Sequence, residues 1–448
     1  MDASSKPEDS SQTIQPEKLR EYLADKKALV FDYSSASRAT VRKILGVFQV
    51  KPGNIDAADN YQEAQEKLKT KQPQVIFCDY ELGGKQTGLD FFQMVKEIYP
   101  SRLDTVFILI SERNSDALAS QVAEQEVDAM VVRPFTHASL EKKFLEVMSS
   151  KVAPSKAQVL IEAGKALLAA KKYDESLKSF QQVNPQDPQS SSALYYQSLV
   201  CKALGKPKEQ QRLLEEGLKR NPIHYKCLCG LFEVMMEIEE YKKAYGICST
   251  LNQNHPVNPS RIPDFVWLSV VNGEYEDIMN YYQIFTELDA PDDTILTYIS
   301  AGLVICGKYF LRQSNESNAL AAFQKASTVS KNKVSILKEI IITLFKAGMM
   351  QPANEYLSRA SDEVRHSSEI LIAELEGIEK TASIEHVVQR CLELLKQGVK
   401  TEKVYELAIQ GSRQMNRPAN SIQELVDEAS LAFPQSKQKF ASSTPTKT

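Results

Sequence analysis

The sequence predicts two structural classes in one chain: an α/β domain with a doubly wound parallel sheet, followed by an all-α superhelix of stacked hairpins. Short apolar runs alternate with amphipathic segments in residues 26–150, which is typical of βαβ units. Beyond Pro154 the apolar residues recur at helical spacing, and prolines return every 34 residues. A chain of 448 residues also exceeds one ordinary core, so we expect more than one folding unit.

Changes in composition set the predicted boundaries. Residues 1–25 begin with a polar, acidic stretch and are interpreted as a disordered leader. The sheet domain spans 26–150 and the helical region 151–435. The closing polar segment, 436–448, is interpreted as a flexible tail.

Four strong strands of the sheet domain are each followed by, or end at, a polar residue, and Ile55–Ala58 supplies a weaker fifth strand. The apolar runs are 28–31, 74–78, 105–110 and 128–132, and the polar residues are Asp32, Asp79, Ser111 and Arg133. In a parallel sheet the carboxyl ends of adjacent strands form the binding crevice at the topological switch point. We therefore expect these four side chains to converge.

The segments around these residues resemble the receiver domain of two-component response regulators. They are VFDYSSASR, VIFCDYELGG, FILIS and VVRPF, in the order and spacing of that family. The resemblance implies a flavodoxin-like (CheY-like) fold in which Asp79 accepts a phosphoryl group. It also implies that Asp32 and Asp79 hold Mg²⁺ and that Ser111 and Arg133 contact the phosphoryl group.

The sequence departs from the receiver pattern at several of these positions. Tyr33 replaces a second acidic residue, and a neutral phenol is a poor ligand for a hard cation. Arg133 replaces the family's lysine with a broad planar fork, and Met130 replaces an aromatic residue. Two interpretations stay open: a phosphorylation switch, and a degenerate pseudo-receiver that serves only as a docking surface.

The helical region repeats with a period of 34 residues. Prolines at 188, 222 and 256 and tyrosines at 173, 241 and 275 lie on this lattice. The first unit places Gly164, Tyr173, Phe180 and Pro188 on the positions of the tetratricopeptide (TPR) motif, which it resembles. A TPR unit is an amphipathic hairpin, and stacked hairpins create a core and a groove that binds peptides or helices.

Later units follow the same pattern less closely. The alanine and phenylalanine series at Ala319 and Phe323 is shifted by 7 residues, and the polar segment 311–318 is the predicted insertion. Seven or eight hairpins are expected in all. The aromatic residues of the lattice, Tyr173 and Phe180 among them, are interpreted as core residues.

Composition and motifs exclude several classes of function. No nucleophile elbow, phosphate-binding loop or kinase motif set is present, so no enzymatic activity is expected. The net charge of −4 argues against a nucleic-acid partner, and the scattered cysteines indicate reduced thiols in the cytoplasm. The uncharged, mainly apolar run 294–307 is shorter than the ~20 residues that span a bilayer, so no membrane insertion is expected.

These features predict a bacterial two-component signalling adaptor in which the receiver-like domain regulates or docks a TPR array that binds proteins. The expected partners are a histidine kinase, another regulator, or motility or cell-surface machinery, and the resemblance also allows a homodimer through the receiver. One alternative is a constitutive scaffold that works without phosphorylation. A further alternative, a helical-repeat RNA-binding protein, requires a basic concave face.

Overall fold

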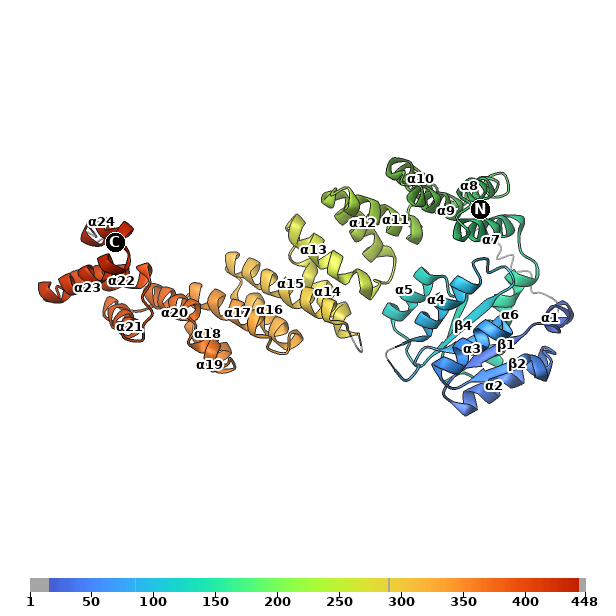
Figure 1. Ribbon diagram of the computed structural model, residues 1–448, viewed down its shortest axis with the longest axis horizontal. Coiled ribbons are helices and arrows are strands. Elements are labelled where there is room, and N and C mark those ends of the chain that lie inside the picture. Colours follow the sequence, from blue (N-terminus) through green and yellow to red (C-terminus); the bar gives the residue numbers. More distant parts are fainter. Residues whose placement is uncertain (1–15, 85, 289–290, 443–448) are drawn as a thin grey trace, which may run out of the picture. The chain divides into compact units, whose positions relative to one another are not determined.

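The computed structural model describes residues 16–84, 86–288 and 291–442. The chain divides into two compact units, Met1–Arg261 and Ile262–Thr448. The first unit contains a five-stranded sheet domain and three helical hairpins, and the second contains further hairpins (Figure 1).

The sheet is entirely parallel, in the order β2-β1-β3-β4-β5. This is the flavodoxin-like strand order expected from the sequence. The strands are β1 (Ala28–Phe31), β2 (Ile55–Ala58), β3 (Val75–Asp79), β4 (Val106–Ser111) and β5 (Ala129–Val132). The connecting helices are α2 (Ser35–Val47), α3 (Tyr61–Lys71), α4 (Gly88–Ile98), α5 (Asp116–Gln125) and α6 (His137–Val152).

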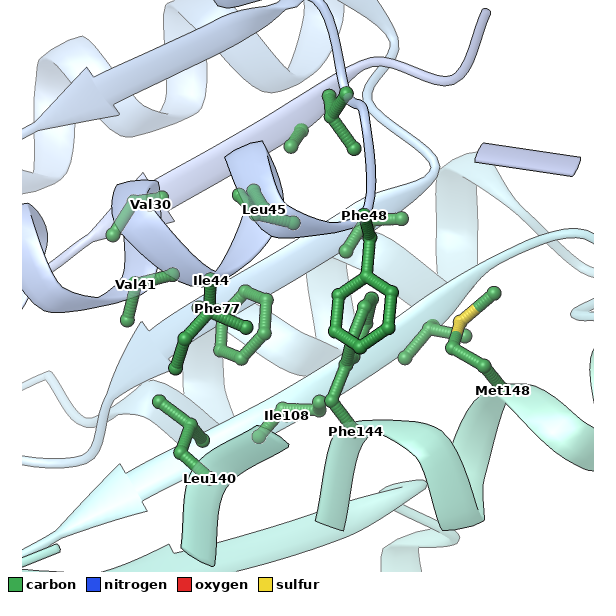
Figure 2. Packing of buried hydrophobic residues seen from close by; sticks show 14 of the residues in the cluster. Val30, Val41, Ile44, Leu45, Phe48, Phe77, Ile108, Leu140, Phe144 and Met148 are labelled. Carbon is green, nitrogen blue, oxygen red and sulfur yellow. The ribbon is translucent and has the colours of Figure 1, made fainter. Parts of the chain in front are cut away.

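Helices cover both faces of the sheet, which explains why its strands are almost uniformly apolar. On one face, α2 and α6 pack against alternate strand residues, among them Val30, Phe77 and Ile108 (Figure 2). On the other face, α3, α4 and α5 pack against the intervening residues, such as Phe31 and Phe107. The two buried faces leave the strand ends as the polar edge of the domain.

Part of the segment predicted to be a disordered leader is helical. Residues 16–23 form α1 (Pro16–Leu23), which packs against α6. Leu19 and Leu23 are buried in the core of the sheet domain. Residues four apart lie on the same face of a helix, so these two leucines form the apolar face of α1. The remainder of the expected leader, residues 1–15, lies outside the described residues.

Three hairpins complete the first unit. They are α7 (Lys156–Ala169) with α8 (Tyr173–Gln181), α9 (Ser191–Ala203) with α10 (Pro207–Arg220), and α11 (Tyr225–Glu237) with α12 (Tyr241–Asn254). A Cβ at Gly164 would lie 2.4 Å from the ring of Phe180, which is fully buried. This close approach explains why a small residue on the first helix accompanies a large one on the second.

The second unit continues the hairpins among its described residues. They are α13 (Ile262–Asn272) with α14 (Asp277–Thr286), α15 (Asp293–Arg312) with α16 (Glu316–Val329), α17 (Val334–Lys346) with α18 (Met350–Ser358), α20 (Ser368–Thr381) with α21 (Ile384–Lys396), and α22 (Glu402–Gln414) with α23 (Ala419–Ala432). A short α19 (Asp362–Arg365) precedes α20. The described residues therefore form eight hairpins in the two units, at the upper end of the expected number.

The position predicted for the seven-residue insertion is wrong. A Cβ at Gly307 would lie 2.4 Å from Phe323, so this pair repeats the Gly164–Phe180 contact with the same spacing in sequence. Segment 311–318, which lies between Gly307 and Phe323, contains no added residues. Instead, α15 has 20 residues, seven more than the 13 residues of α9 and of α11. Seven residues are about two helical turns, so the added length returns to the same helix face.

The end of the chain and α15 also differ from the sequence-based expectations. The segment predicted as a flexible tail contains α24 (Lys437–Ser442), and its Phe440 is fully buried. Residues 443–448 of that tail lie outside the described residues. The uncharged run 294–307 belongs to the longer α15. By length and composition alone, α15 could span a membrane. Half of its most apolar window is buried within the unit, and the core helix of a globular protein has the same length and composition.

Candidate functional site

The polar residues predicted at the strand ends lie at one edge of the sheet. Asp79 and Ser111 are the last residues of β3 and β4, while Asp32 and Arg133 directly follow β1 and β5. The parallel pairing of β1 with β3 and of β3 with β4 places these ends side by side. The structure brings three of the four side chains into direct contact, and we call Asp32, Asp79 and Arg133 the acidic site.

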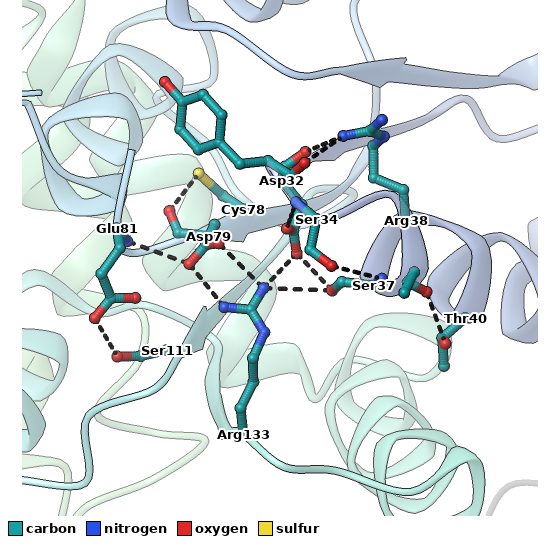
Figure 3. A network of polar contacts seen from close by, with 12 residues as sticks. Asp32, Ser34, Ser37, Arg38, Thr40, Cys78, Asp79, Glu81, Ser111 and Arg133 are labelled. Carbon is teal, nitrogen blue, oxygen red and sulfur yellow. Dashed lines mark hydrogen bonds and ion pairs between the residues drawn. The ribbon is translucent and has the colours of Figure 1, made fainter. Parts of the chain in front are cut away.

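The guanidinium of Arg133 bridges the two carboxylates (Figure 3). Its Nη1 donates to Asp79 Oδ1 at 3.2 Å, and its Nη2 donates to Asp79 Oδ2 at 3.1 Å. The same Nη2 donates to Asp32 Oδ2 at 2.5 Å. A planar fork of this kind suits two-point binding of a carboxylate, which a lysine ammonium cannot reproduce.

The first turn of α2 holds Asp32 in place. Ser37 Oγ donates to Asp32 Oδ2 at 2.5 Å, and the backbone N–H of Ser34 donates to Oδ1 at 2.8 Å. Ser34 is itself the N-cap of α2, because its side chain accepts from the N–H of Ser37. The carboxylate therefore lies at a helix N-terminus, where negative charge is favoured.

Burial governs the electrostatics of the acidic site. The exposed fractions of Asp32 and Asp79 are 0% and 4%. Burial raises the pKa of Asp32 and of Asp79, although hydrogen bonds from Ser37 and Arg133 oppose the shift. Burial opposes the charge of Arg133, but hydrogen bonds to Asp79 and the charge of Asp32 raise its pKa on balance. The cation therefore stays ionised between two carboxylates that are removed from water.

Ser111 lies at the same edge but has different partners. Its hydroxyl donates to Glu81 Oε1 at 3.3 Å and accepts from the N–H of Arg113 at 2.9 Å. The N–H of Glu81 donates to Asp79 Oδ1 at 3.2 Å, so Glu81 connects Ser111 to the acidic site.

Three residues that support this edge were not singled out for it by sequence reasoning. Ser37 and Glu81 contact the strand-end residues, and their only sequence signal is a position just beyond Asp32 or Asp79. Gly88 opens α4, and a Cβ there would lie 2.4 Å from the carbonyl oxygen of Asp79. Only glycine allows this approach without a shift of the backbone.

The residues present do not fit a magnesium site. The carboxylates of Asp32 and Asp79 already accept bonds from Arg133, whose positive charge repels a second cation. The hydroxyl of Tyr33, at the position of a second acid, donates to the carbonyl oxygen of Leu82. Among the described residues no group of three or more His, Cys, Asp or Glu side chains is arranged to hold a metal.

Residues 28–145 match the family model of the response regulator receiver domain. The sheet domain is a receiver domain. The match covers the sheet and most of α6, and it agrees with the strand order. No match is found among curated proteins.

Several solved structures are similar to the helical hairpins at low sequence identity. Naa15/Naa10 bound to HypK-THB is 14% identical, with a TM-score of 0.47, and the match covers 63% of this chain but only 43% of that chain. A tetratricopeptide repeat protein from Parabacteroides merdae ATCC 43184 is 14% identical over 56% of this chain and 97% of its own, with a TM-score of 0.30. MamA from Desulfovibrio magneticus RS-1 is 13% identical over 46% and 92%, with a TM-score of 0.21.

The chain thus combines a receiver domain with TPR-type hairpins. The hairpins follow the 34-residue pattern of the sequence and the Gly164–Phe180 packing described above. Stacked hairpins of this type are protein-interaction scaffolds. Together the two parts characterise a signalling protein that carries an interaction domain.

Proposed function

We propose that this protein is a non-enzymatic signalling adaptor whose receiver domain works without phosphorylation and whose TPR-type hairpins bind partner proteins. The observation that carries this proposal is the fork of Arg133 across Asp32 and Asp79. An aspartyl nucleophile needs a divalent cation and a free approach to the phosphoryl group. In this site an internal cation already occupies the space between the carboxylates.

Phosphoryl transfer to Asp79 is the second candidate function, and the position of Asp79 in the sheet favours it. Asp79 ends β3 at the carboxyl edge of the sheet, and Ser111 ends the neighbouring strand β4. For this reaction Arg133 must first release Asp79, which exposes two buried carboxylates to each other. Removing one partner of a buried ion pair costs about 3–5 kcal/mol, and we expect separation of Arg133 from Asp79 to cost a similar free energy.

A phosphodonor experiment separates the two candidates. The full chain is incubated with Mg²⁺ and acetyl phosphate, and the intact mass is measured before and after treatment with hydroxylamine. We expect no mass increase for the wild type. A hydroxylamine-labile phosphoryl group that is lost in Asp79→Ala would overturn the phosphorylation-independent proposal.

A matched variant tests whether the departures from the family pattern cause this behaviour. Tyr33→Asp combined with Arg133→Lys restores the acidic pair and the compact cation that the receiver family uses. We expect this double variant to bind Mg²⁺, with a higher Tm in 10 mM Mg²⁺, and to accept phosphate on Asp79, since a ligand that binds only the folded state stabilises it. Equal responses of wild type and variant would contradict the role assigned to Tyr33 and Arg133.

Partner binding is tested with the full chain as bait. Under the proposal, wild type and Asp79→Ala capture the same proteins, because the acidic site has a structural role only. Loss of a partner from Asp79→Ala, but not from Asp79→Asn, would indicate a folding defect. Loss from both would favour the phosphorylation switch.

A further inference from the structure

A cluster of cations and hydrogen-bond donors on the first three hairpins contacts two carboxylates of the receiver domain. The carboxylates belong to Glu124, near the end of α5, and Glu126, which directly follows that helix. The donors lie on the first helices of three successive hairpins and on the segment after the third hairpin. We call them the six-donor site: Lys165, Tyr196, Tyr225, Lys226, Asn258 and Arg261.

Each carboxylate has three of these partners. Glu124 accepts from Tyr225 Oη at 2.7 Å, from Asn258 Nδ2 at 2.6 Å and from Arg261 Nη2 at 2.6 Å. Burial opposes ionisation of Glu124, but Arg261 and the hydrogen bonds outweigh it and hold its pKa below the usual value. The donors therefore form a site that is specific for an ionised carboxylate.

Glu126 is held in the same way by the other half of the site. Lys165 Nζ lies 2.9 Å from Glu126 Oε2, and Tyr196 Oη and Lys226 Nζ contact Oε1. The Nζ atoms of Lys165 and Lys226 lie 4.8 Å and 5.4 Å from the centroid of the Tyr196 ring. It also stacks on Phe180 at 5.4 Å, so the hairpin core holds the hydroxyl in place.

The backbone of Glu126 is strained at this position. Its φ of 63° lies in the left-handed region, where helices commonly end at glycine. A residue with a Cβ costs about 1–2 kcal/mol there. The contacts of the carboxylate explain why a glutamate stands at this helix end.

The contact between the two parts is polar, which makes it separable. Two apolar core clusters contain residues of the receiver domain with α1, and two others contain residues of the first two hairpins; none of these four contains residues of both parts. Polar interfaces between domains resemble transient rather than obligate ones. A cavity of about 460 Å³ also opens beside α5, and Tyr225 and Lys226 line it together with Ala123. The receiver helix therefore does not fill the space next to the six-donor site.

We propose that the six-donor site is a receptor for an acidic segment of a partner protein, and that Glu124 and Glu126 occupy it in cis as an internal competitor. This inference rests on the proposed function, because it names the chemistry by which the hairpins recognise a partner. Lys165 and Arg261 also pair with Glu162 and Glu233 on the hairpins, but the partly buried Lys226 would lose its counter-charge. A partly buried cation without a counter-charge is unfavourable, so release of the receiver is coupled to entry of other carboxylates. The receiver domain then sets how tightly an acidic partner binds.

A labelled peptide with the sequence of residues 116–128 tests the proposal on the full chain by fluorescence anisotropy. The double variant Glu124→Gln/Glu126→Gln frees the receptor, and we expect it to bind the peptide at least about tenfold more tightly than the wild type, since cis occupancy reduces the apparent affinity. A peptide with both glutamates replaced by glutamine should not bind. Equal affinity of the wild type and the double variant would overturn the proposal.

Receptor variants locate the binding. Adding Lys226→Ala and Arg261→Ala to the double variant removes one cation from each half of the site and should abolish binding. Lys202→Ala with Lys219→Ala is the matched control, because it removes the same charge from exposed positions on these hairpins. Retained binding in the first set, or equal loss in the control, would contradict the site.

A wild-type measurement covers the case in which a variant does not fold. Excess peptide should raise amide hydrogen exchange in α5 of the unmodified chain, because the peptide displaces that helix; unchanged exchange at saturating peptide would overturn the proposal. If the wild type forms a dimer that Glu124→Gln/Glu126→Gln loses, the occupant of the site is a second copy of this chain, and the proposal of an acidic partner protein is overturned. Failure of the two proposals can be distinguished. If the peptide does not bind but the chain still captures partner proteins, only the six-donor inference is wrong. If Asp79 is phosphorylated but the peptide still binds, only the phosphorylation-independent adaptor proposal is wrong.

Discussion

The acidic site and the six-donor site are both clusters of cations and carboxylates in the unit Met1–Arg261, but they differ in origin and burial. The acidic site lies within one domain, and the side chains of Asp32 and Asp79 are 1% and 6% exposed. The six-donor site joins the receiver domain to the hairpins, and the side chains of Glu124 and Glu126 are 28% and 31% exposed. Ion pairs that are fully removed from water resist separation, whereas partly hydrated pairs exchange partners. The first site therefore suits a structural role and the second a reversible one.

The largest expected effect comes from removing the cation of the acidic site. Arg133→Ala leaves Asp32 and Asp79 buried without a counter-charge, and we expect a loss of about 3–5 kcal/mol in the free energy of unfolding of the receiver domain. Tryptophan fluorescence would not report on this domain, because the single tryptophan, Trp267, lies in α13 of the other unit. Amide hydrogen exchange of β1 and β3 in urea is therefore the suitable measurement.

Arg133→Lys is the control for this prediction. It keeps one positive charge but loses the two-point contact, so its loss should be smaller than that of alanine. If Arg133→Ala leaves the exchange of β1 and β3 unchanged, the acidic site is not structural, and the contrast with the six-donor site fails.

A glycine beneath the acidic site gives the next effect. In Gly88→Ala the new Cβ meets the carbonyl oxygen of Asp79 at 2.4 Å and Leu109 Cδ1 at 2.7 Å. Overpacking of this kind costs about 1–3 kcal/mol, and chemical denaturation of the receiver domain measures it. Gly46→Ala is the matched control, because nothing lies within 4 Å of its Cβ, and in α2 it should stabilise by up to about 1 kcal/mol. Equal stabilities of the two variants would contradict the close packing under Asp79.

The raised pKa of Asp79 predicts a dependence on pH. A carboxyl group whose pKa burial raises contributes stability below its unfolded pKa, and this contribution is lost as the pH rises through the folded pKa. Asp79→Asn resembles the neutral form, so its stability relative to the wild type should increase from about pH 4 to pH 7. Each unit of pKa shift corresponds to about 1.4 kcal/mol. Urea midpoints of both proteins across this range test it, and a constant difference would contradict the assigned direction.

The smallest effect is expected at an exposed ion pair of the hairpins. Lys202 and Glu233 lie 2.9 Å apart, with side chains 44% and 43% exposed. Because water screens such a pair, Lys202→Ala should change the free energy of unfolding by less than about 1 kcal/mol, measured by chemical denaturation. A larger loss would show that exposure is a poor guide to the strength of ion pairs in this chain.

The sequence predicted the sheet domain well because strand and helix periods differ. Parallel strands buried on both faces are continuous apolar runs, so Asp32, Asp79, Ser111 and Arg133 stood out as polar residues at or just after their ends. Short amphipathic elements were missed, because α1 and α24 bury only a few residues each, Leu19, Leu23 and Phe440 among them. The phase slip was detected but misplaced, since added residues inside a helix leave no turn signal.

By itself, the sequence determined the order of the two fold classes, the strand ends that form the acidic site and the 34-residue repeat, because each depends on local periodicity and on connection rules. Only the tertiary structure decided which charges meet. The sequence predicted that Arg133 lies near Asp32 and Asp79, but only the structure shows that it binds both directly; the contact of Arg261 with Glu124, across 137 positions, had no sequence signal. The physical reason is that an ion pair depends on distances of a few ångströms in the folded chain, and a pattern of residue types along the sequence does not encode them.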